Sequence, residues 1–225
     1  DTNGADLILN DSNDSWIDRD PFIIPGEIGT WTTKGGFSFA IMEDGEIIWL
    51  SEQDGFSHIY RNRPDGRPIN QVTRGDWEVN NISAIDYKNE IIYFSAKKET
   101  ETENHLYSIK FNGSRLKRLT KEKGSHSSSF SPTLNYFINS YSSLIVPPKT
   151  LIREDNGKIV RTLSETDRSK FDAYNLTYPQ LINIFTDDGT RLNALITYPH
   201  NFDPMKQYPV ILYNYGGPGS QLVIN

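Results

Sequence analysis

Short runs in which apolar and polar residues alternate follow one another along most of the chain, separated by turns that pair glycine with aspartate or asparagine. Such alternation is typical of half-buried β-strands, and no extended helical stripe occurs before the last fifty residues. The runs also repeat: residues 46–51, Glu-Ile-Ile-Trp-Leu-Ser, return 44 positions later as residues 90–95, Glu-Ile-Ile-Tyr-Phe-Ser. The other repeated pairs are residues 58–60 with 105–107, 65–66 with 112–113 and, more loosely, 91–95 with 136–140 and 112–113 with 156–157.

A repeat of about 40–45 residues that holds several short strands is typical of a β-propeller blade. We therefore expect a mainly β fold with about three and a half four-stranded blades in residues 1–173, residues 7–9 being the outer strand of a preceding blade. An irregular β-sandwich with evenly spaced strands is the alternative. The Asp-Gly and Asn-Gly pairs predict type I′ hairpin turns, whose two central residues need positive φ. An incomplete ring also predicts two open flanks with exposed apolar side chains.

The pattern changes near residue 174. Residues 181–185 and 192–198 predict two strands joined by a hairpin turn at residues 187–189. Residues 208–215 form a continuous apolar run, which predicts a buried strand of a mixed or parallel sheet. A glycine-rich loop follows at residues 216–220, and in α/β folds ligands bind at such strand ends. We expect residues 174–225 to begin a second domain.

Composition narrows the function classes. Lys and Arg number 23 against 29 Asp and Glu, a net charge of −6, which argues against nucleic acid as a partner. The chain has no Cys, which excludes disulfides, thiolate zinc sites and a cysteine nucleophile. No apolar run approaches the roughly 20 residues that a membrane-spanning helix needs. The four His are scattered without metal-ligand spacing, and we expect neither a metal nor a cofactor.

Several motifs together resemble those of one enzyme family. Asp-Gly at 188–189, Asn-Phe-Asp at 201–203 and Tyr-Pro-Val at 208–210 precede Tyr-Gly-Gly-Pro-Gly-Ser at 215–220. Matching propeller segments lie at residues 49–52, 54–56, 58–60 and 73–79. In combination they resemble the dipeptidyl peptidase IV group of prolyl-oligopeptidase-type serine peptidases, along nearly the whole chain. The resemblance implies the second half of an eight-bladed propeller followed by the first strands of an α/β-hydrolase domain.

The resemblance also implies an activity. Members of the group remove dipeptides from peptide N-termini, preferring Pro or Ala as the second residue, through a Ser-Asp-His triad and without a cofactor. We expect a peptide substrate, a possible homodimer of the full-length enzyme, and a periplasmic, extracellular or cell-surface location. Two alternatives stay open: a non-catalytic binding propeller, and a related acylaminoacyl-peptidase or tripeptidyl-peptidase.

Catalytic residues are expected to be sparse in this segment. The sequence contains no G-x-S-x-G nucleophile motif; residues 36–40, Gly-Phe-Ser-Phe-Ala, come nearest and lie in a predicted propeller strand. The triad is therefore expected beyond residue 225, so that the segment alone is inactive. The resemblance implies that the acids that bind the substrate amine lie in an earlier blade, before residue 1. By resemblance, Tyr215 donates a hydrogen bond to the oxyanion of the tetrahedral intermediate. The alternative is that Tyr215 only ends a buried strand.

Other noticeable residues predict structural roles. His58 and His105 occupy equivalent positions of two repeats, so we expect both to be structural. Trp16 and Trp77 occupy matching steps between blades, where packing is expected. Residues 97–103, rich in Lys and Glu, predict a solvated hairpin tip, and residues 125–129, nearly all Ser, predict a loop between blades.

Overall fold

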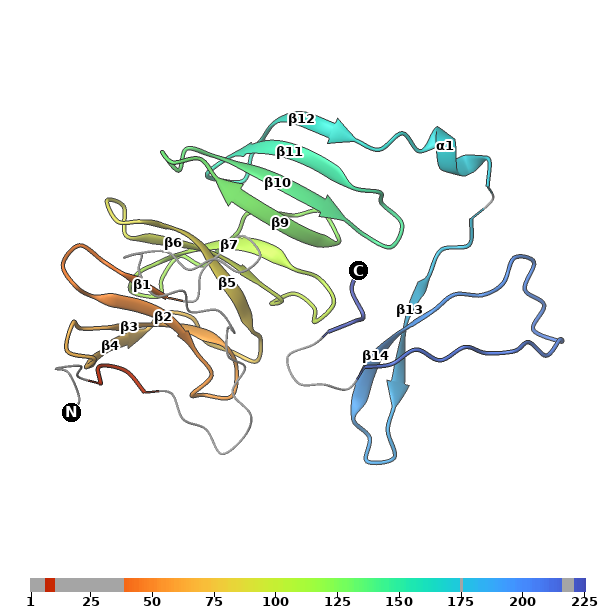
Figure 1. Ribbon diagram of the computed structural model, residues 1–225, viewed down its shortest axis with the longest axis horizontal. Coiled ribbons are helices and arrows are strands. Elements are labelled where there is room, and N and C mark those ends of the chain that lie inside the picture. Colours follow the sequence, from red (N-terminus) through yellow and green to blue (C-terminus); the bar gives the residue numbers. More distant parts are fainter. Residues whose placement is uncertain (1–6, 11–38, 175, 216–220) are drawn as a thin grey trace, which may run out of the picture.

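Strands dominate the computed structural model, which describes residues 7–10, 39–174, 176–215 and 221–225. The described residues form three four-stranded antiparallel sheets and one two-stranded hairpin (Figure 1). The first sheet holds β1 (Phe39–Ile41), β2 (Ile47–Ser51), β3 (His58–Asn62) and β4 (Pro68–Gln71). The second holds β5 (Val79–Asp86), β6 (Ile91–Ala96), β7 (His105–Lys110) and β8 (Lys117–Arg118). The third holds β9 (Ser125–Phe130), β10 (Tyr136–Ser142), β11 (Lys149–Glu154) and β12 (Ile159–Glu165).

Each of these sheets joins its strands in chain order, which is the arrangement of a propeller blade. The repeated segments found in the sequence fall on equivalent strands: β2 and β6 carry the Glu-Ile-Ile repeats, and β3 and β7 both begin at a histidine. The predicted repeat of four-stranded units is confirmed for three sheets. The further half blade and Trp16 were predicted in a region that lies mostly outside the described residues.

The hairpin turns differ in type from the prediction. The glycine N–H donates to the carbonyl three residues earlier, and only the glycine takes positive φ, between 82° and 92°. The preceding Asp or Asn does not take positive φ; its side-chain oxygen accepts the backbone N–H two residues on, at 2.8 to 3.1 Å. This is a type I turn followed by a glycine bulge, and not a type I′ turn. The motif occurs at Gly45, Gly66, Gly113, Gly157 and Gly189.

These turns also show where one sheet meets the next. A Cβ added to Gly113 would lie 2.9 Å from the Val72 carbonyl oxygen, and one added to Gly157 would lie 2.3 Å from that of Leu119. A Cβ added to Gly66 would lie 1.9 Å from the carbonyl oxygen of Ile8. Ile8 therefore takes, toward the first sheet, the place that Val72 and Leu119 take toward the second and third. Residues 7–10 are not assigned as a strand, but their position is that predicted for the outer edge of a preceding blade.

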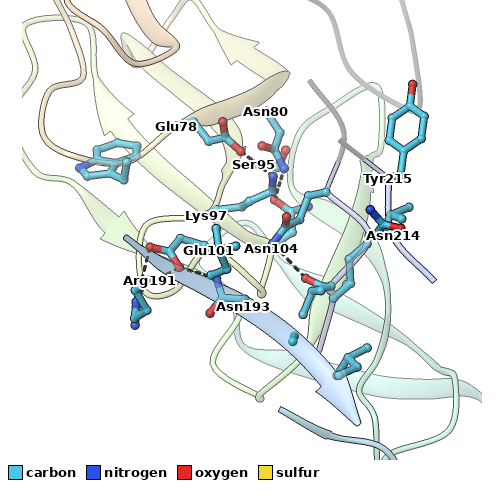
Figure 2. Close-up of a pocket in the computed structure, with 18 of the residues that line it drawn as sticks. Glu78, Asn80, Ser95, Lys97, Glu101, Asn104, Arg191, Asn193, Asn214 and Tyr215 are labelled. Carbon is cyan, nitrogen blue, oxygen red and sulfur yellow. Dashed lines mark hydrogen bonds and ion pairs between the residues drawn. The ribbon is translucent and has the colours of Figure 1, made fainter. Parts of the chain in front are cut away.

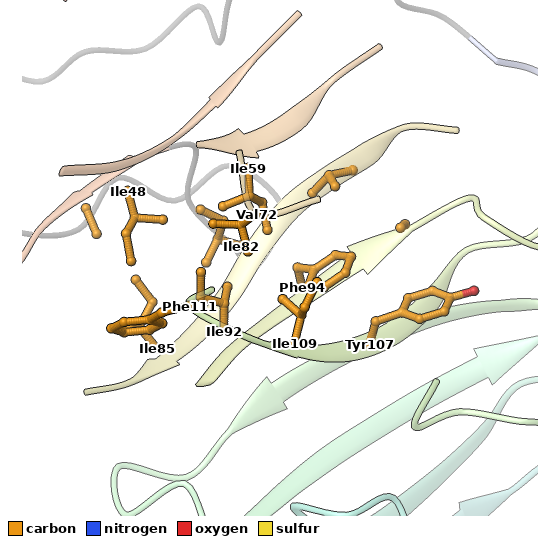
Figure 3. Packing of buried hydrophobic residues seen from close by; sticks show 13 residues of the cluster. Ile48, Ile59, Val72, Ile82, Ile85, Ile92, Phe94, Tyr107, Ile109 and Phe111 are labelled. Atoms are coloured by element: carbon orange, nitrogen blue, oxygen red, sulfur yellow. The ribbon is translucent and has the colours of Figure 1, made fainter. Parts of the chain in front are cut away.

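Apolar side chains fill the space between the first and second sheets (Figure 3). The cluster includes Ile48 and Ile59 from the first sheet and Ile82, Ile92 and Phe94 from the second, all fully buried. Alternate residues of β6 face opposite ways, so Tyr93 contributes instead to a smaller cluster against the third sheet. The sheets are therefore packed face to face through both sides of the second one.

The third sheet departs from the prediction in one strand and agrees with it at the open flank. The Ser-rich residues 125–129, predicted as a loop, form most of β9, which pairs with β10 along six residue pairs. On the outer side, every residue of β12 is exposed, and Ile138 of β10 is 48% exposed. The exposed apolar surface predicted for an incomplete ring is thus present at this end of the described structure.

The last part of the described chain contains one strand fewer than predicted. A short helix, α1 (Ser169–Asp172), precedes a hairpin of β13 (Gln180–Phe185) and β14 (Arg191–Ile196), which confirms the two predicted strands and their turn. Residues 208–215 are not a strand, although they were predicted to be a buried one. A buried strand needs neighbours on both sides, and the described residues place none there, so Ile211 is 97% exposed. No helix within the described residues is long and apolar enough to cross a membrane.

Candidate functional site

A wide cleft of about 2690 Å³ lies between the sheets and the last part of the chain (Figure 2). One wall comes from the first strands of the sheets, including Asn81 and Ser83 of β5 and Ser127 and Ser128 of β9. The other wall comes from β14 and residues 208–215. Pockets for small ligands measure about 300–1,000 Å³, so a cleft of this size has room for a polymer such as a peptide.

The wall formed by the sheets is polar, and its groups bind one another. Lys97 donates to Glu78 at 2.5 Å, and Asn80 Nδ2 donates to Asn104 Oδ1 at 2.9 Å. Asn104 Nδ2 in turn donates to the His126 carbonyl at 2.9 Å, which ties the second sheet to the third. This wall offers amide, hydroxyl and paired charged groups to anything that enters the cleft.

The opposite wall carries Tyr215, the only residue for which the sequence predicts a catalytic role. Tyr215 lines the cleft and its side chain is 61% exposed. Figure 2 shows Tyr215 and Asn214 on the other side of the cleft from Glu78 and Lys97. The structure therefore places an exposed tyrosine at the cleft. Of residues 36–40, where the nearest approach to a nucleophile motif was predicted, only Phe39 and Ala40 are described, and both belong to β1.

The tip between β6 and β7, residues 97–104, is more than the solvated turn that was predicted. Glu101 accepts hydrogen bonds from Arg191 Nη2 at 2.9 Å and from Asn193 Nδ2 at 2.6 Å, both on β14. Glu103 is buried and accepts a bond from Asn225 Nδ2 at 2.5 Å. The predicted hairpin tip is confirmed, and residues 98–101 are exposed. The contacts were not predicted because both sets of partners lie about 90 to 120 positions later in the sequence.

The structural roles predicted for His58 and His105 are confirmed. Each ring is fully buried and places Nδ1 beside a threonine hydroxyl, Thr73 at 3.0 Å and Thr120 at 3.2 Å. Nε2 of His58 faces the Gly75 carbonyl, so that nitrogen carries the proton and Nδ1 accepts from the threonine. Trp77 packs edge-on against His58 with ring centroids 5.0 Å apart, which confirms its predicted packing role.

A buried polar network in the third sheet was not anticipated from the sequence. Arg153, 2% exposed, donates to Asn139 Oδ1 at 3.1 Å and to Glu122 at 2.7 Å. His126 faces Asn139 Oδ1 with one ring nitrogen and the Glu122 carbonyl with the other. The signal was available: Arg153 lies four residues before a turn glycine, where the other repeats place the buried residues Asn62 and Ile109.

The charges of this network shift two pKa values. Partial burial alone would raise the pKa of Glu122, but the hydrogen bond and charge of Arg153, with backbone N–H groups, outweigh it and lower that pKa. Burial lowers the pKa of His126, and the neighbouring His105 ring lowers it further. The Glu122 carbonyl and Asn139 Oδ1 favour the protonated ring, but their effect is smaller. The folded protein therefore favours a charged Glu122 and a neutral His126. No cluster of metal-ligating side chains occurs within the described part of the chain.

Comparison with known proteins agrees with this architecture. Residues 1–148 match the dipeptidyl peptidase IV (DPP IV) N-terminal region. The chain belongs to this family. It is 32% identical over 218 residues to the dipeptidyl peptidase 4 of Arthroderma otae and to that of Trichophyton rubrum, in matches that cover 95% of this chain and 27% of each relative. The resemblance predicted from the motifs is thereby confirmed, for a chain that spans 27% of the length of these curated relatives.

Solved structures of this family have the same fold. The crystal structure of Porphyromonas gingivalis dipeptidyl peptidase 4 superposes with a TM-score of 0.78 at 30% identity, covering 83% of this chain and 27% of that one. A putative dipeptidyl aminopeptidase IV from Bacteroides ovatus gives 0.69 at 25% identity, covering 80% and 28%. The three sheets are thus consistent with blades of a DPP IV-type propeller.

Proposed function

We propose that this chain is part of a serine exopeptidase that removes Xaa-Pro or Xaa-Ala dipeptides from peptide N-termini. In this proposal residues 1–173 belong to the propeller, which positions and gates the substrate. Residues 174–225 begin the α/β-hydrolase domain that carries out acyl transfer. The proposal extends to a homodimer of the whole enzyme and to a location outside the cytoplasm.

The observation that carries the proposal is the place of Tyr215. In a chain of this family, Tyr215 ends the apolar run 208–215 and is followed by a Gly-Gly-Pro-Gly-Ser segment. It lines a cleft whose other wall comes from the first strands of the sheets. A peptide bound between the two walls would have the tyrosine hydroxyl beside it. The polar wall formed by the sheets, with Asn80, Asn104 and Lys97, offers hydrogen-bonding groups to the peptide backbone.

The proposed chemistry assigns Tyr215 one step. When the nucleophilic serine attacks the scissile carbonyl, the carbonyl oxygen becomes an oxyanion. The Tyr215 O–H donates a hydrogen bond to that developing charge, and a donor already aimed at the position of the oxyanion lowers the barrier. Serine, aspartate and histidine of the triad belong, in this proposal, to residues outside this chain, because the chain contains no G-x-S-x-G motif.

A substrate panel tests this function. The whole protein is expected to release a chromophore from a free dipeptide of the Xaa-Pro type, and neither from the N-acetylated dipeptide nor from a tripeptide analogue. Preference for the acetylated substrate would favour an acylaminoacyl-peptidase, and preference for the tripeptide a tripeptidyl-peptidase. If none is hydrolysed, the proposal is wrong and a binding propeller is favoured.

The 225-residue segment serves as the control in that assay. It is expected to hydrolyse none of the three substrates, because the proposal places its triad outside residues 1–225. Hydrolysis by the pure segment would contradict the assignment of the catalytic residues.

A further inference from the structure

We propose that the tip between β6 and β7, residues 97–104, is an acidic clamp that positions the segment carrying Tyr215 against the propeller. Glu101 and Glu103 are its two positioning residues. The inference rests on the proposed function, because it gives these residues a role in placing Tyr215. They act through other residues and do not touch the reacting atoms.

Glu101 holds the part of the chain that comes before Tyr215. Its carboxylate accepts two bonds from Arg191 Nη2, both at 2.9 Å, and one from Asn193 Nδ2 at 2.6 Å (Figure 2). Arg191 and Asn193 lie on the same face of β14, since they are two residues apart in a strand. One carboxylate therefore restrains both the position of β14 and which of its faces is turned toward the tip.

Glu103 holds the part that comes after Tyr215. Asn225 Nδ2 donates to Glu103 Oε1 at 2.5 Å, and the Asn225 backbone N–H donates to the Thr102 carbonyl at 2.8 Å. Glu103 is itself fixed, because its other oxygen accepts from His105 Nε2 at 3.1 Å and that ring is fully buried. Asn225 Oδ1 also accepts from the Leu144 N–H at 3.4 Å, which extends the contact to the third sheet.

Between these two anchor points, the residues just before Tyr215 are largely exposed. Val210, Ile211, Leu212 and Tyr213 are each more than 80% exposed. Packing of residues 210–213 therefore restrains Tyr215 little, and we expect the two anchor points to contribute much of the restraint within the described structure. The clamp is suited to set the width of the cleft because it joins the two walls at residues before and after Tyr215.

The Glu101–Arg191 pair is expected to affect the position of Tyr215 more than the overall stability of the protein. The Glu101–Arg191 pair is half exposed on both sides, at 60% and 51%, and such pairs contribute little to global unfolding. A small displacement of a catalytic group, in contrast, lowers the rate strongly: about 1 Å can cost about a hundred-fold. Loss of the clamp is therefore expected to reduce kcat more than it reduces the melting temperature.

A charge swap in the whole protein tests the clamp. Glu101→Arg and Arg191→Glu are each expected to lower kcat on a chromogenic Xaa-Pro dipeptide by about five- to tenfold, with KM within about twofold. The double variant restores the attraction with reversed sign and is expected to recover most of the lost kcat. Hydrogen exchange of residues 208–215 and 221–225 should quicken in both single variants and slow again in the double variant.

Glu99→Gln is the matched control, because Glu99 lies on the same tip but pairs with Arg118 of its own sheet. It is expected to leave kcat and the exchange of residues 208–215 unchanged. The clamp is refuted if the single variants keep wild-type exchange and kcat, or if the double variant recovers neither. Tyr215→Phe separates the two proposals: a wild-type kcat in that variant overturns the oxyanion role, while the exchange measurements still decide the clamp.

Discussion

The two interfaces between neighbouring sheets are built differently. The interface of the first and second sheets contains 13 buried apolar residues, among them Phe94, which lies between the rings of Trp77 and Tyr107. The interface of the second and third sheets has an apolar cluster of five buried residues, beside which lies the network of Glu122, Arg153, Asn139 and His126.

The difference shows that repeats of one architecture need not share one source of stability. Burial of apolar area stabilises the first interface, and this contribution depends little on pH. The second depends on buried polar groups, which cost free energy unless every one of them is bonded. The second interface also lies beside the cleft, which His126 helps to line. We therefore expect the two to respond differently to substitution and to acid.

The largest effect is expected in the apolar interface. Phe94→Ala removes a fully buried ring and leaves a cavity, so the free energy of unfolding should fall by about 4–5 kcal/mol. Phe137→Ala, in the smaller cluster, should cost about 3 kcal/mol because partly buried side chains such as Phe130 and Leu134 pack against that cluster and fewer buried contacts are lost. Urea denaturation of the two variants measures both, and the reverse order would contradict the comparison.

Removal of the buried guanidinium is expected to come next. Arg153→Leu removes the buried guanidinium that donates to both Glu122 and Asn139 Oδ1, which should cost about 3 kcal/mol. The control is Arg61→Leu in the first sheet, whose pair with Glu46 is partly exposed, and about 1 kcal/mol is expected there. Urea denaturation measures both losses of unfolding free energy. Equal losses in the two variants would show that the polar network stabilises the protein no more than a partly exposed ion pair does.

Substitution of two turn glycines should have different effects, because Gly157 lies against a neighbouring sheet and Gly189 does not. Gly157→Ala would place a Cβ 2.3 Å from the Leu119 carbonyl oxygen and also strain a residue at φ 92°. A loss of about 2–3 kcal/mol is expected. Gly189→Ala, at φ 85° with open space around it, should lose only the conformational part, about 1 kcal/mol. Thermal unfolding of the two variants tests this, and a Gly189→Ala loss as large as that of Gly157→Ala would refute the contact.

The smallest effect is a dependence on pH. Burial lowers the pKa of His126 and of His105 in the folded state, so below about pH 6.5 the unfolded chain takes up protons that the folded chain resists. The stability that these rings contribute at neutral pH is therefore lost progressively as the pH falls from about 6.5. Glu122, with its lowered pKa, adds a further loss below about pH 4.5.

His126→Gln is expected to flatten the first of these losses, measured as unfolding free energy between pH 7.5 and 5.5. An unaltered slope in His126→Gln would show that this ring does not sense pH.

The sequence predicted those features that arise from local pattern and repetition. Alternation predicted the strands of the first two sheets, and glycine predicted the turns. The turn type did not follow, because Asp-Gly is compatible both with a type I′ turn and with the type I turn and glycine bulge that the structure has. Residues 125–129 were missed because Ser carries no apolar signal, and β9 forms through its pairing with β10 beside a polar cleft. Contacts such as Glu101 with Arg191 join residues 90 positions apart and leave no local mark.

Turnover by Tyr215→Phe in the whole protein tests the central claim most directly. The substitution removes one hydroxyl from a side chain that is 61% exposed, so the fold and KM should change little. We expect kcat for a free Xaa-Pro dipeptide substrate to fall by about 10²–10³-fold, the usual cost of losing one oxyanion donor. A kcat within about twofold of the wild-type value would contradict the account.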